Sequence, residues 1–466
     1  MKTKICTLLF VLSLFVFGGC SDYLDKTPAL NLVDEDIYSS AERMDGAVMG
    51  VYTEMKDNHF IGSKAYVCIE NIGDDMINIS GNFYEALSSY EMSVGLETQD
   101  NYETWEGAYQ AINSANTVLA NVESHSAVAG VKYKQYIAEL KFCRALSYYY
   151  LSMLYAQPYK LDAAAKAVPL RLLAESVLEN NDLKRSTVLE VYAQILDDTD
   201  DYADLPSGGA TYDKITRATQ GAVLMLRMRV YMAMNKWDEA IKAGEAVTGY
   251  SLTSGSADPF KSSSSCPESI FSFPMATTNT AGMQAAVPYF FYKGTSLVVD
   301  NTSGIHSPLY PNYNLKADAR ISSLQASANG YVISTKFVDG QTYLDWVPVF
   351  RYAETLLNLA ECYANTGNEA KAKAALEQVR HRSISAGDDP LNISSLAGDA
   401  LKNAIYLERR TEFIGEAIRA IDIHRRTENF VKRKSTSSEF TVTPTTNGYI
   451  WPIPTVERAN NKAIED

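Results

Sequence analysis

The stretch Trp346–Arg382 constrains the fold more than any other part of the chain. Its first half repeats apolar residues with the i, i+3, i+4, i+7 spacing of one buried helical face, at Leu356, Leu359, Ala360 and Tyr363. Gly367 predicts the end of that helix, because glycine adopts the left-handed backbone of a helix terminus without a steric cost. A second apolar stripe follows at Ala372, Leu376 and Val379. The sequence therefore predicts two antiparallel helices that pack closely where small alanines face larger side chains.

A second copy of this pattern lies upstream, over residues 222–247. The offsets of Tyr363, Gly367, Ala372 and Val379 recur at Tyr231, Asn235, Ala240 and Val247. Asparagine is the usual second choice where a helix ends in a left-handed residue. Such hairpins are typical of tetratricopeptide repeats, in which one unit cannot bury its apolar face without neighbours. The sequence therefore predicts a mostly α fold, with a curved scaffold of tetratricopeptide-like helical hairpins.

The helical period recurs in four other segments and is lost in two. Residues 44–55, 105–119, 136–155 and 189–196 each carry an apolar stripe. Residues 68–95 and 251–345 instead mix turn residues, acids and aromatics. A structureless loop as long as the second region is rare in a compact domain, so irregular loops with short strands are expected there. Loops on a rigid scaffold are where binding residues concentrate.

The first 19 residues have the pattern of a secretory signal. Two lysines precede an apolar run of about 13 residues, Ile5–Phe17, which is shorter than the roughly 20 needed to span a bilayer. Gly18 and Gly19 precede Cys20, as lipoprotein signal peptidase requires. We therefore expect lipid on Cys20, which would anchor the protein to a membrane without spanning it. The alternative is an ordinary signal with a chance cysteine.

Three segments, taken in their order along the chain, resemble the SusD/RagB family. They are RYAETLLNLAECYANTGN from Arg351, IYLERRTEFIGEAIRAIDIHR from Ile405, and WPIPTVERANN from Trp451. Within the second, the family's architectural Glu-Arg signature is matched by Glu408, Arg409, Glu412, Glu416 and Arg419. Ala417 departs from the family's glycine-containing turn. Acids and arginines of this segment also have helical spacings that favour ion pairs.

The resemblance implies a surface-exposed lipoprotein of the outer membrane, anchored by lipid and facing outward. Such proteins bind oligosaccharides and deliver them to a SusC-like TonB-dependent transporter, without catalysis and without a cofactor. The expected organisation is a signal peptide at 1–19 and a lipidated tether at 20–30. The helical scaffold comprises 31–250 and 346–466, and the loop-rich insertion 251–345 forms part of the ligand face.

Glycan binding needs flat aromatic faces that stack on sugar C–H groups, and polar side chains that hydrogen-bond to hydroxyls. In the family, the sugar site is drawn from the two loop-rich regions. The first region supplies Asp74, Asp75, Asn82, Phe83 and Tyr84. The second region supplies Tyr289, Phe291, Tyr292, Tyr310 and Tyr313. These ten residues are the candidate ligand-binding set. The alternative is that the aromatics only pin the loops to the scaffold.

Charge and motifs exclude several other classes of function. The formal net charge is −14, and removal of residues 1–19 takes away two lysines and no acids, leaving −16. A surface this acidic repels nucleic acid and anionic lipid. The sequence contains no HExxH, G-x-S-x-G, P-loop or dinucleotide-binding pattern.

The cysteines and the acid run at 197–204 offer no convincing metal site. Cys68, Cys143, Cys266 and Cys362 have no C-x-x-C spacing, which argues against structural zinc. Cys143 and Cys362 lie in apolar helical patterns and are interpreted as buried thiols, while a disulfide among the four stays open. The acid run lacks the glycine and terminal glutamate of an EF-hand loop, so a solvated helix end is the preferred interpretation.

Two alternatives to oligosaccharide capture remain. A RagB-like member of the same family could bind peptides. An all-helical surface glycoside hydrolase would need two carboxylates at a set spatial separation, which a sequence rich in acids cannot exclude.

Overall fold

Two antiparallel helices form the hairpin predicted at 346–382. The structure is a computed structural model that describes residues 34–56, 59–82, 86–175, 181–294, 296–301, 317–433 and 439–464. The two helices are α16 (Tyr352–Asn365) and α17 (Glu369–Ser383). Between them Gly367 has φ +79°, and the backbone N–H of Asn368 donates to the Tyr363 carbonyl at 2.8 Å. The left-handed glycine that ends the first helix is confirmed.

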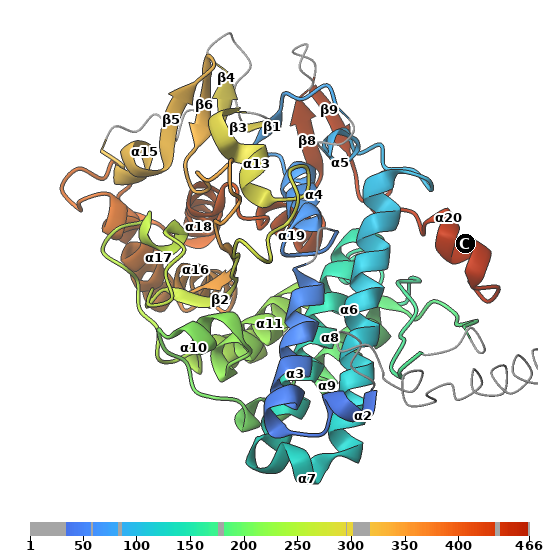
Figure 1. The fold of residues 1–466 in the computed structure, drawn as a ribbon. Helices are drawn as coiled ribbons and strands as arrows, with labels where there is room; N and C mark the ends of the chain where they lie inside the picture. Colours follow the sequence, from blue (N-terminus) through green and yellow to red (C-terminus); the bar gives the residue numbers. More distant parts are fainter. Residues whose placement is uncertain are drawn as a thin grey trace, which may run out of the picture.

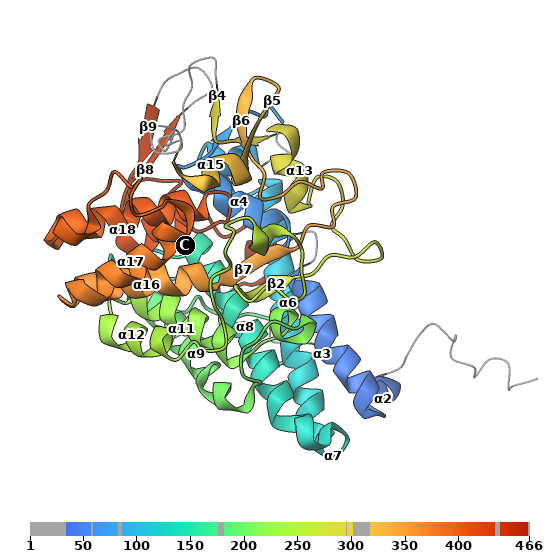
Figure 2. The same ribbon diagram turned by 90° about the vertical axis from the view of Figure 1, so that its left-hand side faces the viewer.

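The upstream copy of this pattern is a second hairpin, α11 (Gln220–Ala233) and α12 (Trp237–Glu245). Asn235 has φ +55° and therefore replaces glycine at the turn, as predicted. The hairpins pack directly on one another: a Cβ on Gly244 of α12 would lie 2.9 Å from Cδ2 of Leu359 in α16. Figure 2 shows α12, α16, α17 and α18 stacked in this order. The mostly α, tetratricopeptide-like scaffold is confirmed.

The remaining helices extend this scaffold toward the N-terminal half, where α3, α6 and α8 pack together (Figure 1). Their α-helical bounds are α2 (Asp34–Ile37), α3 (Ala41–Met55), α4 (Lys64–Ile72), α5 (Leu87–Tyr90), α6 (Gln99–Ser124), α7 (Ser126–Ala129), α8 (Tyr133–Tyr155), α9 (Val188–Asp197), α10 (Tyr212–Thr216), α13 (Val287–Phe291), α15 (Ala319–Leu324), α18 (Gly398–Phe413), α19 (Arg419–Arg426) and α20 (Thr455–Asn460). Single 3-10 turns are η3 (Gly130–Lys132), η4 (Asp200–Asp204), η5 (Asp258–Phe260), η6 (Tyr292–Gly294) and η7 (Ile393–Ser395).

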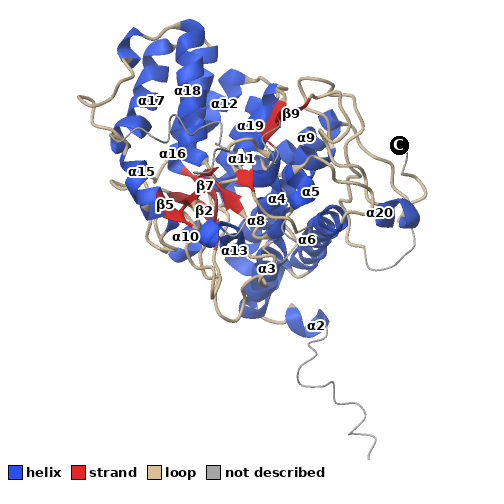
Figure 3. Ribbon diagram, turned by 90° about the horizontal axis from the view of Figure 1, so that it is seen from above, coloured by secondary structure: helices blue, strands red, loops and turns tan. Residues whose placement is uncertain are grey.

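The strands are short and antiparallel, and most come from the two regions that lack a helical period. They are β1 (Ile77–Asn78), β2 (Ser269–Phe273), β3 (Leu297–Val298), β4 (Asp300–Asn301), β5 (Gln325–Ala328), β6 (Tyr331–Ser334), β7 (Val347–Arg351), β8 (Phe430–Arg433) and β9 (Glu439–Val442). They pair as β1–β3, β2–β7, β4–β6–β5 and β8–β9. Figure 3 shows them as small separate patches among the helices.

The pairing of β1 with β3 brings the two loop-rich regions together. Ile77 lies opposite Val298, and Asn78 lies opposite Leu297. Ile77, Tyr90, Val298 and Ile333 form a small apolar cluster beneath this pair. The two segments are more than two hundred residues apart in sequence, yet they meet at the end of the molecule where β3–β6, β8 and β9 also gather (Figures 1 and 2).

A buried network of arginine and carboxylates surrounds the C-terminal end of α18. Arg351 of β7 contacts Glu268 at 2.7 Å, Glu412 at 2.8 Å and Glu416 at 2.6 Å, and all four side chains are at most 5% exposed. The pairs therefore join separate elements rather than successive turns of one helix. Asp422 and Arg425, three residues apart at 2.7 Å, do pair along a helix as their spacing predicts.

The Glu-Arg segment is interrupted by a turn between α18 and α19. Gly415 has φ +79° and Ala417 has φ +56°, so the alanine adopts the left-handed backbone that its family relatives are expected to give to glycine. The buried Glu70 carboxylate accepts both backbone N–H groups, from Gly415 at 3.0 Å and Ala417 at 2.7 Å. Burial raises the pKa of Glu70 to about 7 in spite of these two bonds.

The four cysteines of the described chain are buried free thiols, which confirms the interpretation of Cys143 and Cys362.

In the acid run, Asp198 pairs with Arg144 at 2.6 Å and Asp201 pairs with Lys141 at 2.7 Å. Within the described ranges, no cluster of three metal-binding side chains occurs. Among the same residues, no helix combines the length and apolarity needed to cross a bilayer.

Candidate functional site

Asp74 and Asp75 of the predicted site are buried in ion pairs with the C-terminal helices. Nε of Arg419 lies 2.6 Å from Oδ1 of Asp74, and Nη2 of Arg410 lies 2.6 Å from Oδ1 of Asp75. Asp74 is 8% exposed and Asp75 is 1% exposed. Burial would raise the pKa of Asp74, but Arg419 and Arg410 outweigh it and hold the pKa below its usual value. In this structure both acids connect the segment after α4 to α18 and α19 and are not presented to a ligand.

The predicted aromatics of α13 and the following turn have unequal exposure. Phe291 is fully buried, with its ring centroid 5.1 Å from that of Phe337, so it packs the core as the alternative interpretation expects. Tyr289 is half-buried, with its ring edge-to-face with Phe290 at 5.3 Å. Tyr292 is also half-buried, and a Cβ on Gly340 would lie 2.2 Å from its Cγ.

Asn82 is half-buried just after β1, where its backbone N–H donates to Oγ of Ser80 at 3.0 Å. Its role, like those of Tyr289 and Tyr292, stays a prediction. Five further predicted residues lie outside the described ranges: Cys20, Phe83, Tyr84, Tyr310 and Tyr313.

A polar pocket lies where the second predicted region, through residues 282–285, approaches α4 and the first turn of α6. It has a volume of about 330 Å³ and we call it the Asp100 pocket. Its lining residues come from α4 and its preceding loop, from the start of α6, and from the loop that leads into α13: His59, Lys64, Gln99, Asp100, Glu103, Gly282, Met283, Gln284 and Ala285. Lys64 also lies over the ring of Phe290 at 5.0 Å, which fixes α13 against α4.

Asp100 is the distinctive group of this pocket. Its side chain is 5% exposed, and Oδ1 lies 3.5 Å from Nζ of Lys64. Oδ2 is buried and has no hydrogen-bond partner within the described part of the chain. Burial raises the pKa of Asp100, although Lys64 opposes the shift. An unpaired buried acceptor costs about 1–3 kcal/mol, so a hydrogen-bond donor placed at this oxygen would be favourable.

The remaining polar groups make the pocket suitable for a polyhydroxylated ligand. Gln99 donates from Nε2 to Oε1 of Glu103 at 2.7 Å, and Nε2 of His59 lies 3.8 Å from the same oxygen. A second hollow of about 390 Å³ shares Gln99 and Asp100 and extends past Ser88 and Glu97. The two hollows therefore flank the first turn of α6.

The sequence interpretation missed Asp100 because it is an ordinary first-turn acid. The helix dipole favours Asp and Glu in the first turn of a helix. This preference is the simplest explanation of Asp100, which lies two residues after the N-cap Thr98. The only signal was its place directly after the loop-rich region. The loop 282–285 carried no signal beyond its irregularity.

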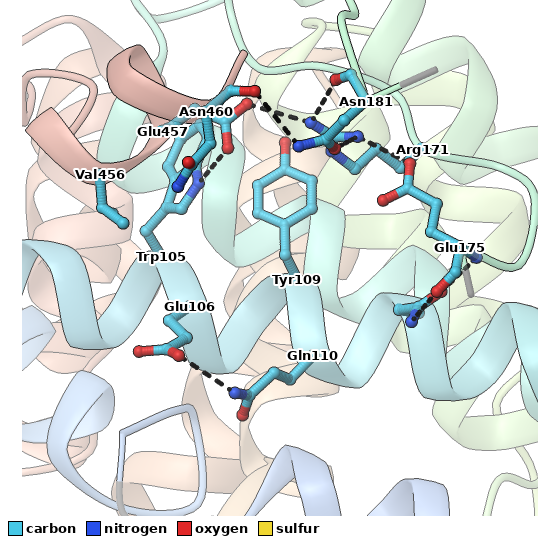
Figure 4. Close-up of a pocket in the computed structure, with 11 residues that line it drawn as sticks. Trp105, Glu106, Tyr109, Gln110, Arg171, Glu175, Asn181, Val456, Glu457 and Asn460 are labelled. Carbon is cyan, nitrogen blue, oxygen red and sulfur yellow. Dashed lines mark hydrogen bonds and ion pairs between the residues drawn. The ribbon is translucent and has the colours of Figure 1, made fainter. Parts of the chain in front are cut away.

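A larger cavity, of about 510 Å³, lies between α6, the segment around Arg171 and α20 (Figure 4). Its polar groups already satisfy each other: Arg171 contacts Glu175 at 2.7 Å and Glu457 at 3.2 Å, and the Trp105 indole donates to Glu457 at 3.2 Å. Trp105 is 3% exposed and therefore presents no ring face. We interpret this cluster as the joint that holds the C-terminal helix against α6.

Comparison with known proteins decides the family. A crystal structure of a SusD superfamily protein from Bacteroides fragilis is 47% identical to this chain, with a TM-score of 0.89, and the match covers 92% of this chain and 100% of that one. The chain belongs to the SusD family. Two family models match separate parts of this SusD-family chain: one described as "Starch-binding associating with outer membrane" over residues 22–232, and one described as "SusD family" over residues 289–466.

More distant SusD-like proteins extend the same comparison. SusD-like protein P25 of Formosa agariphila is 24% identical, over 90% of this chain and 89% of its own length. A putative sugar binding protein from Bacteroides vulgatus is 21% identical with a TM-score of 0.78, over 91% of this chain and 98% of that one. At this identity the second match shows the shared fold alone.

Proposed function

We propose that this SusD-family protein binds oligosaccharides at the Asp100 pocket and delivers them to a partner TonB-dependent transporter without changing them chemically. The observation that carries the proposal is Asp100, which lines the polar hollow and whose buried Oδ2 has no hydrogen-bond partner among the described residues. Membership of a family described as starch-binding supports a carbohydrate as the ligand class. Asn82, Tyr289 and Tyr292 stay proposed as further ligand-binding residues, although they do not line the Asp100 pocket. Phe83, Tyr84, Tyr310 and Tyr313 stay proposed from the sequence alone.

The test of this proposal is Asp100→Asn, which keeps the size of the side chain and removes its charge. We expect the affinity for a bound oligosaccharide to fall by about 10–100-fold, the equivalent of about 1.4–2.8 kcal/mol for a lost hydrogen bond to a charged group. The matched control is Asp399→Asn, because Asp399 is an exposed acid in the first turn of α18 and lines no pocket named here. Calorimetric titration against plant, host and microbial glycans measures both variants.

Product analysis separates capture from catalysis. Long incubation with the bound oligosaccharide should yield no new reducing ends. The alternative of an all-helical glycoside hydrolase would be favoured if the protein released product steadily and Asp100→Asn or Glu103→Gln abolished that release. Tight peptide binding without a glycan signal would favour a RagB-like peptide binder. Equal affinity of the parent and the Asp100→Asn variant would contradict the site assignment.

We further propose that lipid on Cys20 holds the protein on the outer face of the outer membrane. Cys20→Ala should release the protein into soluble fractions, because the described chain has no helix that could retain it. Fractionation of cells that lack any transporter partner is the measurement. Retention of the variant in the membrane of such cells would contradict the anchor.

A further inference from the structure

A further cavity lies between α3, α10 and the adjoining ends of β2 and β7. It has a volume of about 330 Å³, near the lower end of the roughly 300–1,000 Å³ that is usual for small-molecule sites, and we call it the Lys56 pocket. It shares no lining residue with the Asp100 pocket. The two cavities are therefore separate sites.

The walls of the Lys56 pocket are predominantly apolar. Met49 of α3, Phe273 at the end of β2, Met275 and Trp346 line it. The rings of Trp346 and Tyr212 meet edge-to-face at 5.8 Å, and Tyr212 is 49% exposed. Thioethers and aromatic rings adapt to the shape of an apolar group, and neither satisfies the hydroxyls of a sugar.

Among the described residues that line this cavity, Lys56 provides the one charged group. It follows the last residue of α3, and its ammonium donates one hydrogen bond, to the Pro274 carbonyl at 2.8 Å. Within the described residues no carboxylate lies in ion-pair distance of it, whereas the buried Lys64 and Lys336 pair with Asp100 and Glu416. Burial lowers the pKa of Lys56. A bound anion would offset this desolvation and use the remaining donors.

We propose that the Lys56 pocket binds an amphipathic carboxylate, a single aromatic or branched aliphatic group that carries one carboxylate. The apolar group would lie against Met49, Phe273 and Trp346, and the carboxylate would accept from Lys56. A phosphate or sulfate ester is a poorer fit, because such groups are usually held by several donors from arginine or a helix N-terminus, and the pocket offers one cation.

The experiment compares three probes by calorimetry and by the fluorescence of Trp346. They are 3-phenylpropionate, its neutral amide 3-phenylpropanamide, and glucuronate, which has the carboxylate without the apolar group. We expect 3-phenylpropionate to bind at least tenfold more tightly than either of the others. Trp346→Phe should remove the fluorescence change and so assign it to this pocket.

Lys56→Gln should remove the preference for 3-phenylpropionate over 3-phenylpropanamide. The affinity for 3-phenylpropanamide should stay unchanged. Lys134→Gln is the matched control, because that lysine is 76% exposed and lies outside the cavity. Asp100→Asn should not change binding of 3-phenylpropionate, so this proposal and the proposed glycan site can fail independently. Equal affinity for acid and amide, or a preference for glucuronate, would overturn the proposal.

Discussion

His424 shows how the fold alters the chemistry of a single side chain. Its ring is 4% exposed, and Nε2 lies 2.9 Å from the Ala156 carbonyl oxygen. Burial lowers the pKa of His424 to about 4, and the hydrogen bond to Ala156 only partly opposes the shift. The neutral ring is therefore the folded form at neutral pH, with Nε2–H as the donor to the carbonyl.

The unfolded chain binds a proton at His424 below about pH 6.5, but the folded protein does so only near pH 4. Stability should therefore fall as the pH is lowered through this window, by about 3 kcal/mol from this group, at about 1.4 kcal/mol per pKa unit. In His424→Gln, which can still donate to Ala156, the loss between pH 7 and pH 4 should be smaller by about 2–3 kcal/mol. Denaturant unfolding at both pH values measures this, and an identical loss in parent and variant would contradict it.

The helical hairpins are the elements on which the scaffold depends, and each depends on one left-handed residue. Gly367 and Asn235 adopt positive φ where α16 and α11 end. The second hairpin accepts asparagine because its short polar side chain tolerates this backbone. In both hairpins the turn residue, rather than a side-chain contact, fixes where the chain reverses.

Gly367→Ala and Gly46→Ala should change stability in opposite directions. A Cβ on either glycine would meet no heavy atom within 4 Å, so packing is the same for both. Gly367 has φ +79°, and an alanine there should cost about 1–2 kcal/mol. Gly46 lies inside α3, and an alanine there should add about 0.5–1 kcal/mol. Thermal unfolding of both variants is the measurement, and a shift in the same direction would be inconsistent with this account of the turn.

On the scale of the whole molecule, buried ion pairs connect segments that are far apart in sequence. Asp74 and Asp75 join Arg410 and Arg419, and Arg351 joins carboxylates of α18 and of the segment before β2. Such charges are costly to bury and are stable only when every partner is present. The network therefore makes the loop-rich regions and the C-terminal helices depend on each other.

Arg351→Leu should cost about 3–5 kcal/mol, because it leaves Glu268, Glu412 and Glu416 buried without this partner. Arg43→Leu is the control, since Arg43 and Asp36 are about half exposed and lie 3.9 Å apart. This substitution should lower the free energy of unfolding by only about 0–1 kcal/mol. Equilibrium unfolding compares the two. A similar small loss in both would show that the buried network does not hold the molecule together.

The sequence by itself determined the two helical hairpins, their turns and the family. Periodicity and helix-ending residues are local signals: the stripe that ends at Tyr363, the turn at Gly367 and its copy at Asn235 each depend on neighbours within one or two helical turns. Local signals also located most of the two irregular regions, because the absence of a period is itself local. The region predicted at 68–95 was wrong at its start, since α4 continues to Ile72.

Only the tertiary structure decided which side chains of those regions are available to a ligand. Asp74 and Asp75 are occupied by arginines that follow more than 330 residues later, and Phe291 is buried against Phe337. Asp100, an ordinary first-turn acid in the sequence, is enclosed by α4, α6 and the loop 282–285, and its Oδ2 has no hydrogen-bond partner within the described part of the chain. Burial and pairing depend on contacts between distant segments, and a pattern with a range of a few residues does not contain them.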